Sequence, residues 1–353
     1  MNFLYDAWYC AGWAADLTDQ LQPIKLLDEP VVLYRKQDGS PVAIGNRCPH
    51  RFAPLDMGKQ VGDCIECPYH GLRFDADGQC VHNPHGDGTI PRAAKVKSYP
   101  LVERHDALWI WMGEPAKADP AMIPDMSNIV QRSGWAQVHG QLKIQANYQL
   151  VIDNLLDLSH VQYLHPYLSF DGPPPPGFDV RVGFRQEGDH VFHDNVLTNM
   201  PTTPLFKALW GDQQVDMGEV RSNMRWSPPS NLLLDVGMVA PGGSIEDGVC
   251  IPTAHLITPE TEHSTHYFWA QTRNRRIDDE VFSIEMQRGI SDVFINEDER
   301  MIEACQQMMG TNDLMSLKPV LLPGDSAAIR ARRVLAGKIE AERGDTELTQ
   351  VKA

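Results

Sequence analysis

Short stretches in which apolar and polar residues alternate fill the first third of the chain, and this pattern predicts β-strands. Asp-Gly pairs separate two sets of such stretches, as they do in tight β-hairpins. A compact aromatic stretch, Leu-Trp-Ile-Trp-Met, follows them. We therefore expect a small antiparallel β framework with two hairpins and an aromatic strand: 31–35 with 42–44, 72–74 with 79–81, and 108–112.

The pattern changes after a proline-containing segment at 113–125, which predicts a domain boundary. Beyond it, apolar residues recur at helical spacing in some stretches and alternate in others. Strands and helices are segregated along the chain, which favours the α+β class. The expected domains span residues 1–118 and 119–353. Helices are expected at 147–165, 279–310 and 325–343, and strands at 190–198, 215–226, 231–239 and 251–272.

The composition is that of a globular protein, because 42% of the 353 residues are hydrophobic and 22% are charged. No stretch approaches the ~18 apolar residues that a membrane helix needs. Residues 1–16 lack the basic region and the cleavage site of a secretory signal. We therefore expect a cytoplasmic protein. The net charge of −16 disfavours nucleic acid and anionic membranes as partners.

The seven cysteines do not suggest a disulfide framework, since their number is odd and four of them are scattered. These four lie in apolar surroundings, and we expect buried free thiols: Cys10, Cys80, Cys250 and Cys305.

Two other cysteines belong to blocks that also hold a histidine, Cys48-Pro49-His50 and Cys67-Pro68-Tyr69-His70. Residues 51–66 separate the blocks. In a zinc site of two cysteines and two histidines, the cysteines usually come together before the histidines. Here cysteine and histidine alternate, which is the pattern of a Rieske [2Fe–2S] centre. In such a centre the cysteines, Cys48 and Cys67, bind one iron, and the histidines, His50 and His70, bind the other. Cys64 lies outside this spacing.

A second group of polar residues lies within the expected helix at 147–165. Asn154, Asp157 and His160 are spaced three apart and would share one helical face. His165 lies five residues after His160, which rotates the second ring by ~140° on a straight helix. Both rings can reach one metal ion only if the helix bends, ends or bulges between them. Two unrelated histidines on a core helix are the alternative.

An iron held by two histidines and one carboxylate, with open positions, is the oxygen-activating site of non-haem oxygenases. The third ligand would then come from the acidic helix at 293–309. Asp298 lies four residues after Phe294 and four before Ile302, so it points inward with the apolar stripe. Glu297 points more to the side and is the weaker candidate. A solvated acidic turn is the alternative to a metal ligand.

With these motifs, the chain resembles the oxygenase component of a Rieske non-haem iron oxygenase, and within that family the aromatic O-demethylases of the vanillate and dicamba type. The two metal motifs are specific, and the other matching stretches only support the resemblance. The matching stretches are 7–9, 48–55, 67–71, 83–86, 108–111, 153–160 with His165, 257–262 and 296–298.

The resemblance implies an all-β Rieske [2Fe–2S] domain followed by a helix-grip catalytic domain with an antiparallel sheet and a long helix. It implies two cofactors, the cluster and a mononuclear Fe(II), and a head-to-tail homotrimer. In such a trimer Asp157 would bridge a Rieske histidine of one subunit, His70, to the iron ligand His160 of the next. Asn154 would lie beside the iron.

The resemblance also implies a reaction. A separate flavin and iron–sulfur reductase, or a ferredoxin with its reductase, would deliver electrons from NAD(P)H. A C–H bond of a methoxy group on an aromatic ring would be hydroxylated with O₂, which yields a phenol and formaldehyde. The chain has no glycine fingerprint for NAD, in agreement with a reductase on another polypeptide. Ring hydroxylation, N-demethylation and simple electron transfer are the alternatives.

The expected substrate is an aromatic carboxylate or a similar anion. His255 matches a position that can line the substrate pocket of the dicamba type. A buried structural histidine is the alternative.

Overall fold

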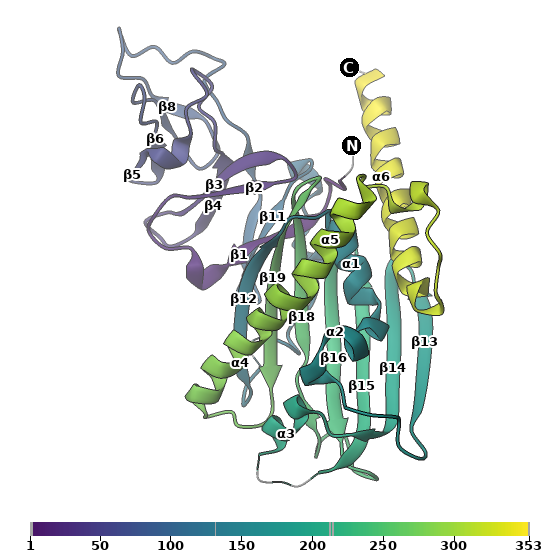
Figure 1. Cartoon of the computed structure of the whole chain (residues 1–353). Coiled ribbons are helices and arrows are strands. Elements are labelled where there is room, and N and C mark those ends of the chain that lie inside the picture. The colour runs from purple at the N-terminus through teal and green to yellow at the C-terminus, as the bar shows by residue number, and fades with distance from the viewer. Residues whose placement is uncertain (1–2, 131, 212, 214, 352–353) are drawn as a thin grey trace. The chain divides into compact units, whose positions relative to one another are not determined.

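The structure is a computed structural model that describes residues 3–130, 132–211, 213 and 215–351 (Figure 1). The chain forms two compact units. The first, the N-terminal unit, comprises Phe3–Ile123 with Thr258–Thr261. The second comprises Pro124–Ile257 and the described residues from Glu262 onward, and we call it the catalytic unit after the domain that the resemblance predicts there. The functional boundary at 118/119 stays a prediction.

The N-terminal unit consists of three small sheets whose strand pairs are antiparallel. Both predicted hairpins and the aromatic strand are confirmed, with Tyr34 opposite Val42 and Phe74 opposite Cys80. The sheets are, in strand order, β1 (Trp8–Trp13), β11 (Ala107–Trp111) and β10 (Leu101–Arg104); β2 (Gln22–Leu26), β3 (Glu29–Arg35), β4 (Pro41–Gly45) and β9 (Ser98–Tyr99); and β5 (Lys59–Val61), β6 (Cys64–Glu66), β7 (Arg73–Phe74) and β8 (Cys80–His82).

The core of the N-terminal unit lies where two of these sheets meet the cysteine-containing loops. Val32, Ile44 and Phe74 are buried there together with Cys48 and Cys67. Each buried apolar side chain of this size contributes about 1.5–3 kcal/mol to folding. The strand alternation that predicts the framework therefore also holds the two loops in place.

The catalytic unit is built on one eight-stranded sheet. The strands expected near residues 190–272 are confirmed within it, which agrees with the α+β class. The strand order is β12 (Ala136–Ile144), β19 (Ser264–Arg273), β18 (Thr253–Thr261), β16 (Asn231–Val239), β15 (Met217–Ser227), β14 (His190–Pro201) and β13 (Asp179–Glu187), and β17 (Val249–Cys250) pairs with β16.

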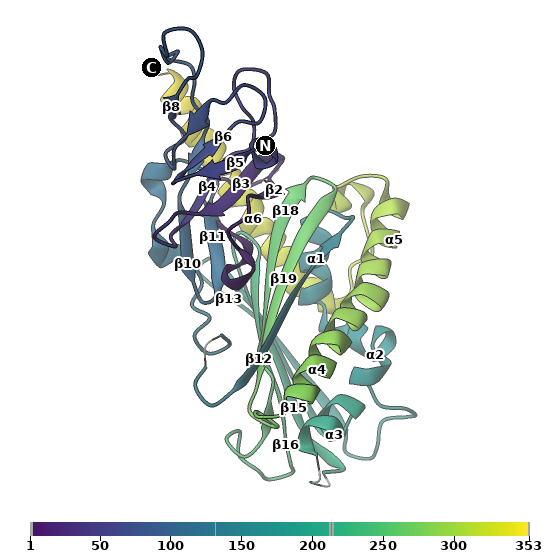
Figure 2. The same ribbon diagram turned by 90° about the vertical axis from the view of Figure 1, so that its left-hand side faces the viewer.

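A long helical rod crosses the sheet of the catalytic unit, as Figures 1 and 2 show. It consists of three contiguous segments, so the helix expected at 279–310 is confirmed. A last helix lies along β13 and β14 and confirms the helix expected at 325–343. The helices are α1 (Tyr148–Leu156), α2 (Val161–Leu164), α3 (Pro204–Trp210), the rod of α4 (Glu280–Val293), the π-helical segment η7 (Phe294–Glu299) and α5 (Arg300–Met309), and α6 (Ser326–Val351).

The single helix predicted at 147–165 is wrong. Helix α1 ends at Leu156, and a 3-10 turn, Leu158–His160, follows it. Asp157 has φ −100° and ψ 90°, and its carboxylate accepts a hydrogen bond from the Ser159 N–H. Aspartate side chains compete with the helix in this way by bonding the backbone two residues on. Asn154, Asp157 and His160 therefore do not share one continuous helical face.

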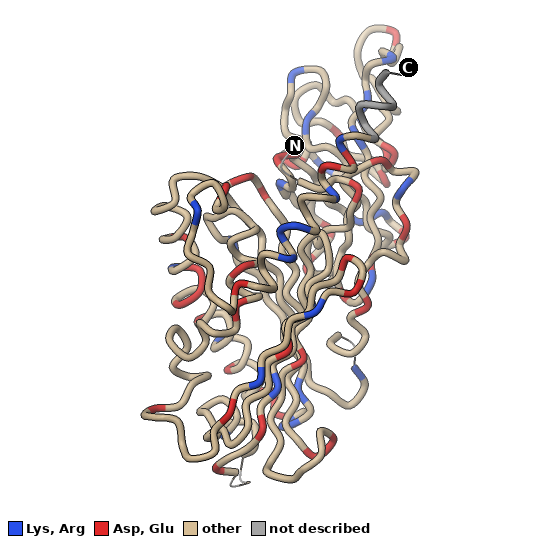
Figure 3. Tube along the Cα trace, turned by 90° about the vertical axis from the view of Figure 1, so that its right-hand side faces the viewer, with Lys and Arg blue, Asp and Glu red and all other residues tan. Residues whose placement is uncertain are grey.

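All seven cysteines are free, in agreement with the expected absence of a disulfide framework. Cys10, Cys80 and Cys250 are buried as predicted, but Cys305 is exposed. It lies on α5, whose buried face is marked by Ile302, three residues earlier. No helix within the described part of the chain is long and apolar enough to cross a membrane. Figure 3 shows acidic and basic residues interspersed along the trace of both units.

Candidate metal centres and the adjoining cavity

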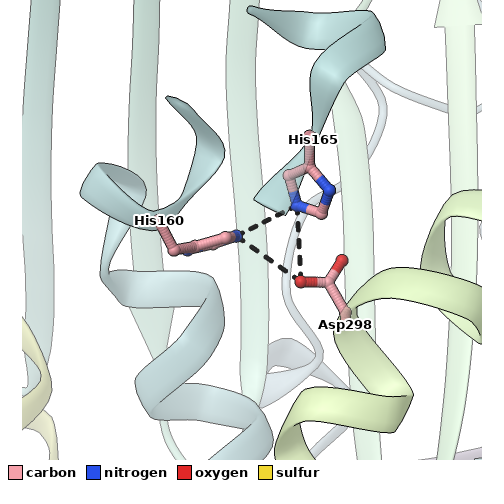
Figure 4. A group of neighbouring side chains, drawn as sticks. All are labelled: His160, His165 and Asp298. Atoms are coloured by element: carbon pink, nitrogen blue, oxygen red, sulfur yellow. Dashed lines mark hydrogen bonds and ion pairs between the residues drawn. The ribbon is translucent and has the colours of Figure 1, made fainter. Parts of the chain in front are cut away.

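Three side chains predicted as iron ligands converge in the catalytic unit (Figure 4). His160 Nε2 lies 3.1 Å from His165 Nε2 and 3.5 Å from Asp298 Oδ1. His165 Nε2 lies 3.4 Å from the same carboxylate oxygen. No other group of three histidine, cysteine, aspartate or glutamate side chains brings its ligand atoms this close together among the residues that the structure describes.

The three atoms form a triangle that suits one metal ion. An ion about 2.1 Å from three ligands at right angles holds the ligand atoms about 3.0 Å apart. The observed separations of 3.1–3.5 Å are slightly larger. Two imidazole nitrogens and one carboxylate on one face match the donor set of non-haem Fe(II) and leave the opposite face open. The residues therefore fit the iron that the sequence predicts.

The two histidines reach this point because the backbone is irregular on both sides of α2. The sequence predicts one break between the two histidines. The structure has two breaks, one on each side of this short helix. The first is the turn at Asp157, before His160. The second is His165, which ends α2 with φ −117° and ψ 83°. Pro166 follows directly, and a residue before proline is disfavoured in the helical conformation.

Asp298 is only 4% exposed, as its inward direction in the sequence predicts. It lies in the π-helical segment, η7. A π-helix widens the turn, and such segments are frequent at functional sites. The segment directs the neighbouring side chain, Glu297, to the site as well, where Glu297 Oε2 lies 2.6 Å from His165 Nδ1. The sequence predicts that Glu297 points to the side. Its contact with His165 could not be predicted, because two adjacent residues on an ordinary α-helix point in different directions.

Hydrogen bonds at Nδ1 set the protonation of both imidazoles. His165 Nδ1–H donates to the Glu297 carboxylate, and His160 Nδ1–H donates to the carbonyl oxygen of Asp157. With the proton on Nδ1, each Nε2 is a free lone pair directed at the proposed ion. Burial lowers the pKa of His165, but Asp298 and Glu297 raise it by more, so its net pKa is raised.

Asn154 and Asp157 lie next to the three proposed ligands. Asn154 Nδ2 donates a hydrogen bond of 3.1 Å to Asp298 Oδ1, so it steadies the carboxylate. Asp157 is half-buried, and its Oδ1 accepts hydrogen bonds from the Ser159 N–H at 3.0 Å and from the Ser159 hydroxyl at 2.6 Å. Its second oxygen has no hydrogen bond or ion pair with the described residues, so the role of Asp157 as a bridge between subunits stays a prediction.

The four residues predicted as cluster ligands come together on two loops of the N-terminal unit. Cys48 and Cys67 are 1% and 2% exposed, and their thiols contact each other. The rings of His50 and His70 lie side by side, with centroids 4.3 Å apart. Two thiols on one side and two imidazoles on the other suit a cluster with sulfur ligands on one iron and nitrogen ligands on the second.

The two loops have the same backbone design. Phe52 N–H donates to the Cys48 carbonyl at 2.9 Å, and Gly71 N–H donates to the Cys67 carbonyl at 3.0 Å. Both donors have a positive φ, of 60° and 72°. Glycine adopts this conformation freely, whereas phenylalanine does so at a cost. In addition, His85 Nε2 lies 2.8 Å from the His70 carbonyl oxygen, a contact that no motif in the sequence predicts.

A cavity of about 1180 Å³ adjoins the proposed iron ligands within the catalytic unit. His255 is among the residues that line it and is 3% exposed, so its role as a substrate residue stays a prediction. Its Nδ1 lies 2.6 Å from the Tyr267 hydroxyl, while its Nε2 has no hydrogen-bond partner among the described residues. Burial lowers the pKa of His255 to about 4, so the ring is neutral at pH 7.

One unit has the cysteine and histidine arrangement of a Rieske centre. The other has a group of two histidines and one carboxylate beside a cavity. Together these two features define the class of Rieske non-haem iron oxygenases. Comparison with known proteins agrees. The Rieske [2Fe-2S] domain profile matches residues 7–100. The profile of the vanillate O-demethylase oxygenase C-terminal domain matches residues 144–341.

The similarity to known proteins extends over nearly the whole chain. The oxygenase component of chloroacetanilide N-alkylformylase from Rhizorhabdus wittichii is 40% identical, over 96% of this chain and 97% of that protein. The oxygenase component of dicamba O-demethylase from Stenotrophomonas maltophilia is 36% identical, over 94% and 97%. Dicamba monooxygenase bound to 3,6-dichlorosalicylic acid superposes with a TM-score of 0.89 at 32% identity, over 97% and 99%. The chain therefore belongs to the Rieske non-haem iron oxygenases of the vanillate O-demethylase type, as an oxygenase component.

Proposed function

We propose that this oxygenase removes an alkyl group, in the first place a methyl group, from oxygen on an aromatic substrate. In the proposed reaction, a methoxy-arene, O₂, two electrons and two protons give a phenol, formaldehyde and water. A separate reductase supplies the electrons from NAD(P)H. The observation that carries the proposal is the group of His160, His165 and Asp298 at the wall of a large cavity, in a chain that also has a Rieske domain.

Four residues, Cys48, His50, Cys67 and His70, are the proposed ligands of the [2Fe–2S] cluster, and His160, His165 and Asp298 are those of the mononuclear Fe(II). When bound, the iron supplies oxygen activation and the cluster supplies single electrons.

The chain's own residues prepare the iron site. Asp157 and Glu297 hold the Nδ1 protons, so that the two Nε2 atoms are unprotonated. Asn154 orients the carboxylate of Asp298. The walls of the cavity are largely apolar, so they bind an aromatic ring and exclude water from the reacting carbon. Leu234 and Phe294 are examples of these wall residues.

N-dealkylation is the second candidate reaction. The relative that is 40% identical is a chloroacetanilide N-alkylformylase, whereas the dicamba relative is an O-demethylase. The same residues would serve both reactions, since each oxidises a carbon attached to a heteroatom. Ring hydroxylation and simple electron transfer have no comparable support.

We further propose a homotrimer in which Asp157 of one subunit contacts His70 of the next, and a flavin and iron–sulfur reductase or a ferredoxin system as the electron donor. The support is the resemblance to the family and the unengaged second oxygen of Asp157. The cytoplasmic location also stays a prediction.

Product analysis tests the proposed reaction. The purified protein, loaded with iron, is incubated with NADH, a surrogate reductase and a panel of methoxybenzoates, methoxybenzamides and N-alkylanilides. Release of formaldehyde together with the matching phenol is the expected result, or, from an N-alkylanilide, release of the matching aldehyde together with the N–H anilide. A ring-hydroxylated product without formaldehyde would overturn dealkylation. Oxidation of NADH with no product from the whole panel would contradict the oxygenase assignment of the cavity.

A further inference from the structure

We propose that the cavity selects an uncharged aromatic substrate that carries a carboxamide-type group, able both to accept and to donate a hydrogen bond, rather than an aromatic carboxylate. This inference rests on the proposed function and names the substrate class of the same site. The relatives leave this choice open, since their printed ligands include both an anilide and a salicylic acid.

The cavity has no free cation for a carboxylate. Among the described residues that line it, Arg276 is the one lysine or arginine. Its guanidinium is already engaged, because Nη2 lies 2.6 Å from Asp279 Oδ2 and the group stacks on the Phe282 ring at 3.8 Å. Glu285 also lines the cavity and would repel an anion. A carboxylate moved from water into this site would therefore lose hydration without gaining an ion pair.

The proposed iron does not supply the missing positive charge. A divalent ion held by His160 and His165 would have the Asp298 carboxylate as a ligand. The Glu297 carboxylate lies one imidazole further out, hydrogen-bonded to His165. With the ion bound, the two carboxylates would balance its two positive charges, so this group would carry no net positive charge to pair with a substrate carboxylate.

His255 offers a hydrogen-bond donor at the cavity wall. The Tyr267 hydroxyl makes its one hydrogen bond to His255 Nδ1, at 2.6 Å, and has no other acceptor among the described residues. We therefore assign its proton to this bond, which makes Nδ1 the acceptor. The neutral imidazole then carries its own proton on Nε2. This N–H is buried without a partner, which is costly unless a ligand or a water molecule accepts from it.

Gln271 offers an acceptor at the same wall. The Thr253 hydroxyl donates to the Ile251 carbonyl at 3.1 Å and accepts from Gln271 Nε2 at 2.8 Å. This chain of hydrogen bonds orients the amide and leaves Gln271 Oε1, which is buried, without a partner. A carboxylate has only acceptors and would meet this oxygen unfavourably. A carboxamide would satisfy both groups, because its C=O accepts from His255 and its N–H donates to Gln271.

The two groups lie on the same side of the sheet. Thr253 and His255 are two residues apart on β18, so their side chains share one face and are about 7 Å apart along the strand. Gln271 on β19 is bonded to Thr253. The ring of Phe294 packs on His255 with centroids 6.1 Å apart, and it connects this polar pair to the segment that carries Asp298.

Equilibrium binding to matched ligands tests the inference without turnover. The iron-loaded protein is titrated calorimetrically, without O₂ or reductase, with 2-methoxybenzamide, its N,N-dimethyl derivative and 2-methoxybenzoate. We expect the benzamide to bind at least about tenfold more tightly than the benzoate, with the dimethyl derivative between them because it lacks the N–H donor. Binding of the benzoate as tightly as the benzamide overturns the inference, as does binding of neither.

A variant pair assigns the acceptor. Gln271→Met keeps the length of the side chain and removes the amide, so it should weaken benzamide binding about tenfold and leave the dimethyl derivative unchanged. Gln141→Met, at an exposed position of β12, is the matched control and should change neither. Equal loss for both ligands in Gln271→Met would overturn the role of Gln271 Oε1.

Product analysis of the same ligands separates this inference from the proposed function. Formaldehyde from a tightly bound benzoate would overturn the substrate class and leave the reaction standing. A tightly bound benzamide that yields no formaldehyde would leave the binding inference standing and overturn the reaction.

Discussion

The two candidate metal centres are built in opposite ways. The proposed cluster ligands lie on two loops of similar design, and their histidines reach the surface, where His50 is exposed and His70 half-buried. The proposed iron ligands come from two helical segments far apart in the sequence, and two of them, His165 and Asp298, are almost completely buried. An exposed imidazole edge suits the transfer of electrons to and from a partner, whereas burial suits a reaction that must exclude water.

Among variants that test this difference between the two centres, Asp298→Ala should have the largest effect on turnover. The variant should keep its colour and its cluster but lose mononuclear iron, and turnover should fall at least about a thousandfold, because two imidazoles alone hold Fe(II) weakly. Iron analysis and product formation measure both effects. If iron content and turnover survived, Asp298 would be only a buried acid, and Glu297 would become the candidate ligand.

A different outcome is expected at the cluster, where a ligand can be exchanged without loss of the metal. His70→Cys should lower the reduction potential from the Rieske range towards about −400 mV, the value typical of all-thiolate [2Fe–2S] proteins. Redox titration followed by visible absorption measures the shift. An unchanged potential in a protein that keeps its cluster would show that His70 is not a ligand.

Asp157 is the residue proposed to connect the two centres across subunits. Asp157→Asn removes the charge and keeps an oxygen for Ser159, so both metal centres and the trimer should survive. Turnover should fall about a hundredfold, since electrons would pass slowly between subunits. In a single turnover, the reductase should reduce the cluster normally, while substrate and O₂ should oxidise it slowly.

Ser159→Ala is the matched control, because it breaks the hydroxyl bond to Asp157 and keeps the charge. It should oxidise its cluster at nearly the parent rate. Equally fast cluster oxidation in Asp157→Asn would remove Asp157 as the bridge. Full activity of a monomer would refute the route between subunits.

The smallest effect is expected from Glu297→Gln, which acts on the iron through His165. Loss of the carboxylate should weaken iron binding about tenfold to a hundredfold, as is typical for partners of ligand histidines. Competition with a chelator measures the affinity, and the [2Fe–2S] spectrum should not change. Asp292→Asn, an exposed acid on α4, is the control and should bind iron as the parent does. Equal affinities in the two variants would make the Glu297 contact incidental.

The contrast between the centres also explains what the sequence could predict. The cysteine and histidine blocks are short, and each places its proposed ligands within one turn. Their spacing was therefore sufficient to predict that the four side chains come together. The apolar stripe on its helix was enough to predict that Asp298 points inward. It was not enough for Glu297, because only the π-helical segment directs two adjacent carboxylates to one site. The breaks on either side of α2 depend on the Asp157 turn and on Pro166, which outweigh the helical spacing of the leucines.

The central claim is that one chain holds two different iron centres, and the most direct test is the ratio of iron to acid-labile sulfide in the purified parent protein. A Rieske cluster contributes two irons and two sulfides, and the site of His160, His165 and Asp298 contributes one iron without sulfide. The account predicts about three irons and about two sulfides per chain. A mild chelator should remove the one iron that exceeds the sulfide, and turnover should be lost with it. A ratio of about one iron per sulfide in a fully active protein would contradict the account.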